Sequence, residues 1–293
     1  MPELPEVETI KNELAPHLVG RRFADVSLPY PGAVKRPSPE EFRRLLTGRL
    51  VTGLGRRGKY LIIRLENGVS PRDNPTGAPE EARSELPGHS QFKKAFIIHL
   101  RMTGALLLKP PQPDPWARAV FRLDDGAEIV FSDRRKLGAL WLVEDENEVV
   151  GKLGPDALDP GFTARVLAQR LSGRAAPIKA LLLDQGFLAG VGNMYADEAL
   201  WAARIHPLRK GKGLSPGDGE RLFRAIRLVL ETAIESKGAS ISTYRRPGGE
   251  LGSAQNGFKV AHLGGRPCPE CATPIQRLAV RNRGSYFCPR CQV

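Results

Sequence analysis

Long apolar runs are absent from this 293-residue chain, and none approaches the roughly 18 residues that a membrane-spanning helix requires. The first nine residues are polar and lack the apolar stretch of a secretory signal. With 41% hydrophobic and 26% charged residues, the composition is that of an ordinary globular protein rather than a disordered one. We therefore expect a cytoplasmic protein that has no membrane partner.

Cysteine is also scarce, and the four that occur stand close together in the last part of the chain. Disulfides are rare in the cytosol, so cysteines in such a protein are better interpreted as metal ligands. The spacing Cys268-x2-Cys271, sixteen residues, then Cys288-x2-Cys291 matches a four-thiolate zinc site that is closed to substrate. The alternative, two redox-active or merely buried cysteine pairs, leaves this spacing unexplained. We expect one structural Zn²⁺.

Acidic residues are outnumbered, with 32 Asp and Glu against 44 Lys and Arg, so the formal net charge is +12. Residues 241–293 hold eight basic and two acidic residues, which is half of this excess. Clustered cations release counterions from a phosphate backbone and so favour a nucleic-acid partner. The alternative is a surface charge that serves only solubility, and the clustering in one segment argues against it.

The first half of the chain has the pattern of one helix followed by short strands. Val7, Ile10, Leu14 and Leu18 recur at helical spacing. Strand-like runs separated by turn residues follow at 23–28, 50–54, 60–65, 95–100, 104–108, 119–123, 128–131 and 139–143. Many short strands of this kind indicate a β-sandwich or barrel. The Pro-rich, acidic stretch at 68–91 reads as a mobile loop, to which we assign no chemistry.

The pattern changes from strands to helices around residues 153–156. We therefore place a hinge at 151–162, between an N-terminal domain (1–150) and a helical domain (163–262), with the cysteine module at 263–293. The clearest helix of the second half carries its apolar residues on one face, at Leu222, Phe223, Ile226, Val229, Leu230, Ala233 and Ile234. The expected fold class is α+β.

The second residue offers unusual chemistry. Removal of Met1 would leave Pro2 with a free secondary amine, and the reference pKa of an α-amino group lies near ~8. Such an amine can attack an electrophilic sugar carbon and form a Schiff base, in this case a charged iminium. The dipole of the first helix disfavours positive charge on this amine, whereas the neighbouring Glu3 and Glu6 favour it.

Four further segments suggest contacts to DNA, and the first three have a simpler alternative. Gly190-Val191-Gly192-Asn193 stands before a helix and can offer N–H groups to a phosphate, or can be a tight turn without a ligand. The cations of 56–60 and 99–104 stand at strand ends, where loops can reach a groove of DNA. Alternatively, they are simply part of the solvated basic surface. In 131–138, three consecutive cations precede the apolar Leu137, as in proteins that wedge a base step apart.

Taken together, these motifs resemble bacterial formamidopyrimidine-DNA glycosylase. The matching segments occur in the family's order over nearly the whole chain: MPELPEVET (1–9), RGKYL (57–61), HLRMTG (99–104), DRRKLG (133–138), LDQGFLAGVGNMYADE (183–198) and the cysteine hairpin. The resemblance implies an N-terminal catalytic β-sandwich with an N-terminal helix, a helix-two-turn-helix DNA-binding domain and a zinc-finger β-hairpin. It also implies excision of 8-oxoguanine and formamidopyrimidines from double-stranded DNA, followed by β,δ-elimination at the abasic sugar.

The resemblance assigns roles to individual residues. The Schiff-base nucleophile, the acid/base at the sugar, the cation that supports β-elimination and the arginine associated with δ-elimination are, in this order, Pro2, Glu3, Lys59 and Arg283. The side chains that fill the gap left by the extruded base and probe the partner cytosine are Met102, Arg135 and Leu137. Such an enzyme must extrude its target base and plug the vacancy. Further contacts to the DNA backbone fall on His99, Asn193, Arg118 and Arg174.

The chain departs from the family's pattern in three places. Leu137 stands where most members have Phe, so the wedge is smaller and cannot stack. The 69–91 insertion lies between strands of the domain that would face DNA. Residues 250–262, which resemble the loop over the damaged base, match it poorly.

Two other functions stay open at this point. One is an endonuclease VIII-like glycosylase that excises oxidised pyrimidines. Members of that branch generally have Gly where Leu4 stands. The other is a non-catalytic zinc-finger DNA-binding protein, which a retained Met1 would favour, because Met1 turns the Pro2 amine into an amide. We expect a monomer associated with the nucleoid.

Overall fold

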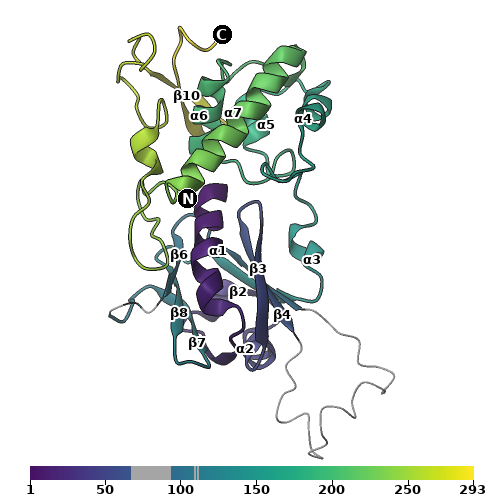
Figure 1. Ribbon diagram of the computed structural model, residues 1–293, viewed down its shortest axis with the longest axis vertical. Coiled ribbons are helices and arrows are strands. Elements are labelled where there is room, and N and C mark those ends of the chain that lie inside the picture. The colour runs from purple at the N-terminus through teal and green to yellow at the C-terminus, as the bar shows by residue number, and fades with distance from the viewer. Residues whose placement is uncertain (67–93, 109, 111) are drawn as a thin grey trace, which may run out of the picture.

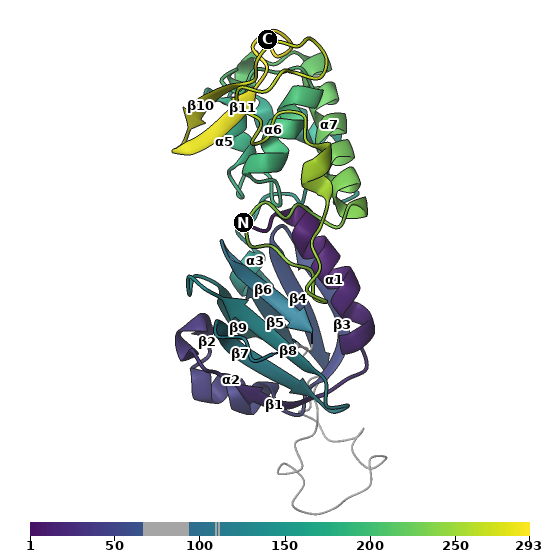
Figure 2. The same ribbon diagram turned by 90° about the vertical axis from the view of Figure 1, so that its left-hand side faces the viewer.

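The protein consists of a strand-rich half and a helical half that follow one another along its long axis, with the N-terminus between them (Figure 1, Figure 2). The computed structural model describes residues 1–66, 94–108, 110 and 112–293. The stretch 68–91, for which we expected a mobile loop, lies outside the described residues, as does the 69–91 insertion. Within the described part of the chain, no helix has the length and apolar character needed to cross a membrane.

The strand-rich half is a sandwich of two sheets, in the orders β1-β7-β8-β6 and β2-β9-β5-β4-β3. The strands are β1 (Phe23–Ser27), β2 (Val34–Arg36), β3 (Leu50–Arg57), β4 (Tyr60–Glu66), β5 (Lys94–His99), β6 (Gly104–Leu108), β7 (Ala117–Leu123), β8 (Glu128–Asp133) and β9 (Ala139–Val143). Phe23 and Phe121 of one sheet contact Phe96 of the other, with ring centroids 6.1 and 5.1 Å apart. These rings fill the space between the sheets, and the expected α+β sandwich is confirmed.

One helix and one strand of the sandwich were not expected from the sequence. Helix α2 (Pro39–Leu46) begins after Ser38, whose hydroxyl accepts a hydrogen bond from the Glu41 N–H at 3.2 Å. It buries Phe42 and Leu46 against the sandwich. The Ser-Pro-Glu-Glu sequence at 38–41 is a helix-start signal that could have located α2. Strand β2 is three residues long and pairs in parallel with β9, which leaves almost no periodic signal.

Helix α1 (Leu4–Leu18) connects the cores of the two halves. It begins at the junction and runs along the sandwich (Figure 1). Leu4 belongs to the helical core, whereas Val7, Ile10, Leu14 and Leu18 belong to the sandwich core, and all are at most 1% exposed. The N-terminal residues are therefore held by apolar burial on both sides of the junction.

Helix α3 (Asn147–Val150) follows β9 and belongs to the strand-rich half, where Val149 packs against Ile62 and Ile97. The helical half contains α4 (Ala164–Leu171), α5 (Ile178–Leu182), α6 (Asn193–Ala202) and α7 (Pro216–Glu235). Short 3₁₀ turns lie at Pro31–Ala33 in the strand-rich half and at Gly211–Gly213 and Ala254–Gly257 in the helical half. Helix α5 is only five residues long, and turns follow it up to the glycines that precede α6. The β-hairpin of β10 (Gln276–Val280) and β11 (Arg283–Phe287) projects from this half on the side of the N-terminus (Figure 2).

Ion pairs join the two halves at the expected hinge. Arg56 Nε lies 2.8 Å from Glu8 Oε2, and Arg56 Nη1 lies 2.6 Å from Asp156 Oδ2. The Gly58 N–H also donates to Asp156 Oδ2, at 2.6 Å. Burial raises the pKa of the Asp156 carboxyl, but the hydrogen bonds and charge of Arg56 outweigh it and leave this pKa lowered. Arg56, one of the cations considered for a DNA-facing loop, instead connects the domains.

Candidate active site

A cavity of about 390 Å³ lies at the junction, and both halves contribute to its walls. The candidate residues that line it are Met1, Glu3, Lys59, Met102, Asn193 and Arg283. They come from the start of α1, the β3–β4 turn, the β5–β6 turn, the start of α6 and the finger hairpin. Pro2 is buried beside this cavity, between Met1 and Glu3. The tertiary structure therefore brings together the residues expected to be catalytic.

Glu3 is fixed through one oxygen of its carboxylate. Its Oε1 accepts a hydrogen bond from the Met194 N–H at the N-terminus of α6, at 3.2 Å, and its own N–H donates to Glu6 Oε2 at 2.7 Å. The positive end of the α6 dipole favours a carboxylate at this position. The second oxygen, Oε2, is buried without a hydrogen-bond partner among the described residues. This free oxygen can exchange a proton with a substrate.

The glycines at 190 and 192 allow the N-terminus to approach α6. A Cβ on Gly192 would lie 2.2 Å from the Glu3 carboxyl carbon, and one on Gly190 would lie 2.4 Å from Leu4 Cδ1. Gly190 also has a φ of +104° and accepts the Leu4 N–H at 3.1 Å. Side chains at these positions would push Glu3 and Leu4 away. In this structure the turn therefore holds the N-terminal residues, and it is Glu3, rather than a phosphate, that meets the helix N-terminus.

A second carboxyl group, Glu6, lies behind Glu3. It is fully buried and accepts hydrogen bonds from the Tyr195 hydroxyl at 2.5 Å and the Ala239 N–H at 2.8 Å. Burial, and then the charge of Glu3, raises the pKa of Glu6. Burial and the nearby Glu6 raise the pKa of Tyr195 well above its usual value. Glu6 thus attaches α1 to α6 and to the segment that follows α7.

Lys59 approaches Glu3 from the sandwich. It follows Gly58, which has a φ of +57° in the tight turn between β3 and β4, and its side chain is only 5% exposed. Burial lowers the pKa of the Lys59 ammonium and Arg283 adds to this effect, while Glu3 and Glu6 act in the opposite direction. An ammonium with a lowered pKa releases its proton more readily near neutral pH.

His99 is a neutral hydrogen-bond donor rather than a cation. It is 7% exposed at the end of β5 and packs edge-on against Tyr60, with ring centroids 4.4 Å apart. Burial, with contributions from Arg101 and Lys59, lowers the pKa of His99 to about 3. Its Nδ1 accepts the Arg101 N–H at 3.0 Å, so the single proton of the neutral ring is on Nε2. His99 can therefore donate to a phosphate without carrying charge.

The finger hairpin is attached to α5 and α6 through the carbonyl of Gly284. Asn193 Nδ2 donates to this carbonyl at 3.0 Å and Lys179 Nζ at 3.4 Å. Lys179 in turn forms a fully buried ion pair with Asp197, at 2.6 Å. Burial lowers the pKa of Lys179 and raises that of Asp197 to about 7, and their mutual attraction limits both shifts. Because Gly284 follows Arg283 directly, these contacts determine where Arg283 enters the cavity.

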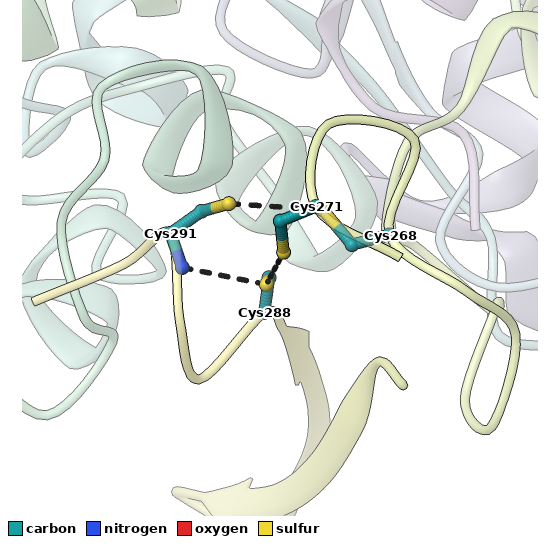
Figure 3. Close-up of side chains that lie close together, drawn as sticks. All are labelled: Cys268, Cys271, Cys288 and Cys291. Atoms are coloured by element: carbon teal, nitrogen blue, oxygen red, sulfur yellow. Dashed lines mark hydrogen bonds between the residues drawn. The ribbon is translucent and has the colours of Figure 1, made fainter. Parts of the chain in front are cut away.

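Four cysteine sulfur atoms lie at the base of this hairpin. The Sγ atoms of Cys268, Cys271, Cys288 and Cys291 lie within 4.8 Å of one another and surround a common centre (Figure 3). A set of four sulfur donors suits Zn²⁺ in a tetrahedral site that leaves no position for substrate. Gln292 connects the site to the helical half, since it accepts the Cys288 N–H and donates to the Ile205 carbonyl. These residues fit one structural zinc, which would fix the base of the hairpin where β11 ends.

The remaining candidate residues lie outside the cavity. Arg135 and Leu137 are exposed on the loop between β8 and β9, where Leu137 is 43% exposed. Arg118 donates from Nε to the Asp133 carbonyl at 2.8 Å, so it supports this loop. Arg174 is exposed after α4 and is not among the residues lining the cavity.

Sequence reasoning missed part of the cavity wall. Ile241 and Ser242 line the cavity. The loop over the damaged base was expected at 250–262, but within that range only His262 lines the cavity. Burial lowers the pKa of His262, which has a left-handed φ of +62°. The Gly- and Ser-rich composition of 238–265 indicates a loop but does not indicate which of its residues face inward.

Models of known families match the chain in three consecutive segments. These are the formamidopyrimidine-DNA glycosylase N-terminal domain over residues 1–140, its H2TH domain over 153–245, and the zinc finger found in FPG and IleRS over 265–293. The chain belongs to the formamidopyrimidine-DNA glycosylase family. This membership confirms the resemblance that the sequence motifs suggested.

Individual relatives cover the full length of this family member. It is 42% identical to the formamidopyrimidine-DNA glycosylase of Symbiobacterium thermophilum, covering 100% of this chain and 89% of the relative. For the enzyme of Chloroflexus aurantiacus the identity is 41%, with coverage of 100% and 98%. The crystal structure of the MutM (Fpg) protein from Thermus thermophilus matches with a TM-score of 0.83 at 36% identity, covering 99% and 98%. A complex of Lactococcus lactis Fpg with abasic-site DNA matches with a TM-score of 0.83 at 30% identity, covering 99% of each chain.

Proposed function

We propose that this protein is a base-excision-repair DNA glycosylase and AP lyase that removes oxidised purines through a Schiff base at Pro2. The observation that carries the proposal is one cavity lined by Glu3, whose Oε2 is unpartnered, and by the buried Lys59, with Pro2 buried beside it between Met1 and Glu3. The names of the relatives support it, and one solved Lactococcus lactis complex contains Fapy-dG DNA. Met1 is removed in the active form, because its peptide bond would occupy the lone pair of the Pro2 nitrogen.

The first chemical step replaces the base by the Pro2 nitrogen. The lone pair of this nitrogen attacks C1′ of an extruded nucleotide, and the electrons of the glycosidic bond leave with the oxidised base. The sugar ring opens to give an iminium between Pro2 and C1′. Glu3 Oε2 exchanges the protons that ring opening requires. The α6 N-terminus holds the other carboxylate oxygen, so Glu3 stays in position during this exchange.

The second step cleaves the strand. The iminium withdraws electrons and acidifies the C2′ proton, whose removal expels the 3′ phosphate in β-elimination. A second elimination then expels the 5′ phosphate. Lys59 and Arg283 both line the cavity, one from each half of the molecule, where their charges stabilise the departing phosphates. His99 and Asn193 offer neutral hydrogen-bond donors to the DNA backbone. Arg118 and Arg174, outside the cavity, offer positive charge to it.

The partner of this reaction is double-stranded DNA, which the protein binds as a monomer in the cytoplasm, at the nucleoid. Met102, Arg135 and Leu137 fill the gap that the extruded base leaves. The zinc held by the four cysteines positions the hairpin and with it Arg283. Residues 1–150 form the catalytic domain, 163–262 the helix-two-turn-helix domain with the loop over the lesion, and 263–293 the finger, with a hinge at 151–162.

Borohydride trapping tests this function. Protein with Met1 removed is mixed with a duplex that contains 8-oxoguanine opposite cytosine, and a Pro2→Gly variant and an oxidised-pyrimidine duplex serve as comparisons. We expect a covalent adduct that needs Pro2 and prefers 8-oxoguanine. A preference for the oxidised pyrimidine would indicate an endonuclease VIII-like substrate range. Tight binding to the damaged duplex without an adduct would indicate a DNA-binding protein that lacks the chemistry.

A further inference from the structure

Two loops at the junction end of the sandwich are linked through one hydroxyl group. The turn 100–103 joins β5 to β6, and the loop 134–138 joins β8 to β9. Thr103 Oγ1, in the first, donates a hydrogen bond to Asp133 Oδ1, at the start of the second, and accepts the Arg135 N–H at 3.3 Å. A single hydroxyl thus uses both its donor and its acceptor capacity between the loops.

Asp133 organises the backbone of the second loop. Its side chain is 0% exposed, Oδ1 accepts the Arg135 N–H at 3.1 Å, and Oδ2 accepts the N–H groups of Leu137 and Gly138 at 2.7 and 2.6 Å. A Cβ on Gly138 would lie 2.3 Å from the Phe131 ring, so this close approach requires glycine. Lys136 has a left-handed φ of +57°. A carboxylate that accepts three N–H groups around such a turn holds the loop in one conformation.

Along residues 134–137, side chains that lie against an aromatic ring alternate with side chains that are exposed. The Arg134 guanidinium lies 5.9 Å from the centre of the Trp116 ring, and Lys136 Nζ lies 5.1 Å from that of Tyr30. Cations over aromatic faces are attracted to them. The side chains of Arg135 and Leu137 are exposed, and in the described part of the chain neither forms a hydrogen bond or an ion pair. Two side chains are therefore held back while the two assigned to the DNA gap project outward.

We infer that Thr103 and Asp133 are positioning residues that couple the Met102 turn to the Arg135–Leu137 loop, so that the gap-filling side chains enter DNA as one unit. This inference rests on the proposed function, since it assumes that Met102, Arg135 and Leu137 fill the gap. Arg135 then contacts the partner base from a fixed backbone position, because its N–H donates to both Thr103 and Asp133. Loss of the hydroxyl would let the two loops move independently and weaken the distinction between cytosine and adenine.

The test compares T103V, which keeps the shape of the side chain and removes the hydroxyl, with T103S, which keeps the hydroxyl. The readout is the ratio of kcat/KM for 8-oxoguanine opposite cytosine to that opposite adenine. We expect T103V to lower this ratio roughly 2- to 10-fold, as for the loss of one hydrogen bond, and T103S to restore it. Borohydride trapping on a single-stranded abasic oligonucleotide, which has no partner base, stays unchanged for both variants.

Two controls distinguish this inference from the proposed function. R135A removes the side chain that reads the partner base, and D124N removes a charge on the exposed β7–β8 turn of the same sheet. If T103V keeps the wild-type preference for cytosine over adenine while R135A loses it, the coupling through Thr103 is overturned and the proposed function is unaffected. A T103V variant that also loses single-stranded trapping, without rescue by T103S, would reduce Thr103 to a general structural role. An unchanged ratio in R135A would reject the gap-filling assignment itself.

Discussion

At the scale of single residues, the geometry of Glu3 is the most informative feature. Leaving a buried polar atom without a partner costs about 1–3 kcal/mol, yet Glu3 Oε2 is in this situation while Oε1 is bonded to α6. Natural proteins tolerate such costs mainly where function requires them. The unpartnered oxygen therefore supports an acid/base role that the sequence motif alone could only suggest.

The first prediction concerns Glu3→Gln. An amide retains an oxygen that accepts the Met194 N–H but cannot exchange protons, so single-turnover excision of 8-oxoguanine should fall roughly 10²- to 10⁴-fold while duplex affinity is retained. Glu40→Gln, at an exposed position of α2, provides the matched control. An excision rate equal to that of the wild type would rule out proton transfer by Glu3.

The second prediction concerns pH and His99. Because its pKa is about 3 in the folded protein, against an ordinary value of 6.5, the unfolded chain binds a proton between these values that the folded protein does not. The contribution of neutral His99 to stability is therefore complete above pH 6.5 and declines as the pH falls toward 3.

The His99→Gln variant should show a weaker loss of unfolding free energy between pH 6.5 and about pH 4 than the wild type, measured by urea unfolding. His17→Gln, at an exposed position of α1, is the control. Duplex affinity at neutral pH should change little in His99→Gln, because the amide supplies a neutral donor. Parallel pH profiles for wild type and His99→Gln would show that His99 titrates normally in the folded protein.

At the scale of elements, the helix and strand periodicity of the sequence located most of the fold. Several of the candidate functional residues, however, lie in the turns between strands. The β3–β4 turn carries Lys59, the β5–β6 turn carries Met102 and the β8–β9 loop carries Arg135 and Leu137. Buried carboxylates accept N–H groups of two of these segments: Asp133 accepts those of Leu137 and Gly138, and Asp156 accepts that of Gly58. The Asp-Arg-Arg-Lys-Leu-Gly motif indicated a wedge, whereas the role of Asp133 as its organiser depends on strand pairing.

The third prediction belongs to the β8–β9 loop. Leu137→Phe should improve affinity for an abasic-site duplex opposite cytosine, and its discrimination against adenine, by a modest factor of roughly 2 to 10, because an aromatic ring stacks on bases. Titration of a labelled duplex measures both quantities. Leu228→Phe, which adds a ring at an exposed position of α7, is the control. Unchanged selectivity between cytosine and adenine in Leu137→Phe would contradict a wedge at this position.

At the scale of the whole molecule, the site exists because two domains meet at the N-terminus. Helix α1 contributes to both cores, and the Arg56–Asp156 pair holds the hinge beside the Lys59 turn. The finger hairpin completes the cavity from the other side through Asn193 and Lys179. A change at any of these three connections alters the distance between groups that must act on one nucleotide.

The fourth prediction concerns zinc removal. Chelation should disorder the hairpin and weaken duplex affinity about as much as Arg283→Ala, because both remove the same phosphate contact, and added Zn²⁺ should restore it. At saturating abasic DNA, the yield of the Pro2 adduct should change much less than the affinity. Loss of the adduct with unchanged affinity would contradict a purely structural zinc.

The amino-acid sequence alone determined the zinc ligands, the first helix, most strands and the family, because each leaves a local mark: a fixed cysteine spacing, a period of 3.6 or 2, or a short motif. Tertiary structure decided which of these parts meet. The contact between Glu3 and Met194 joins residues 191 positions apart, and the neutral state of His99 depends on burial by several strands. Arg56 stood among the cations considered for contact with DNA, and in the structure it forms ion pairs with Glu8 and with Asp156 of the hinge. Such outcomes depend on packing between distant segments, for which no local periodicity exists.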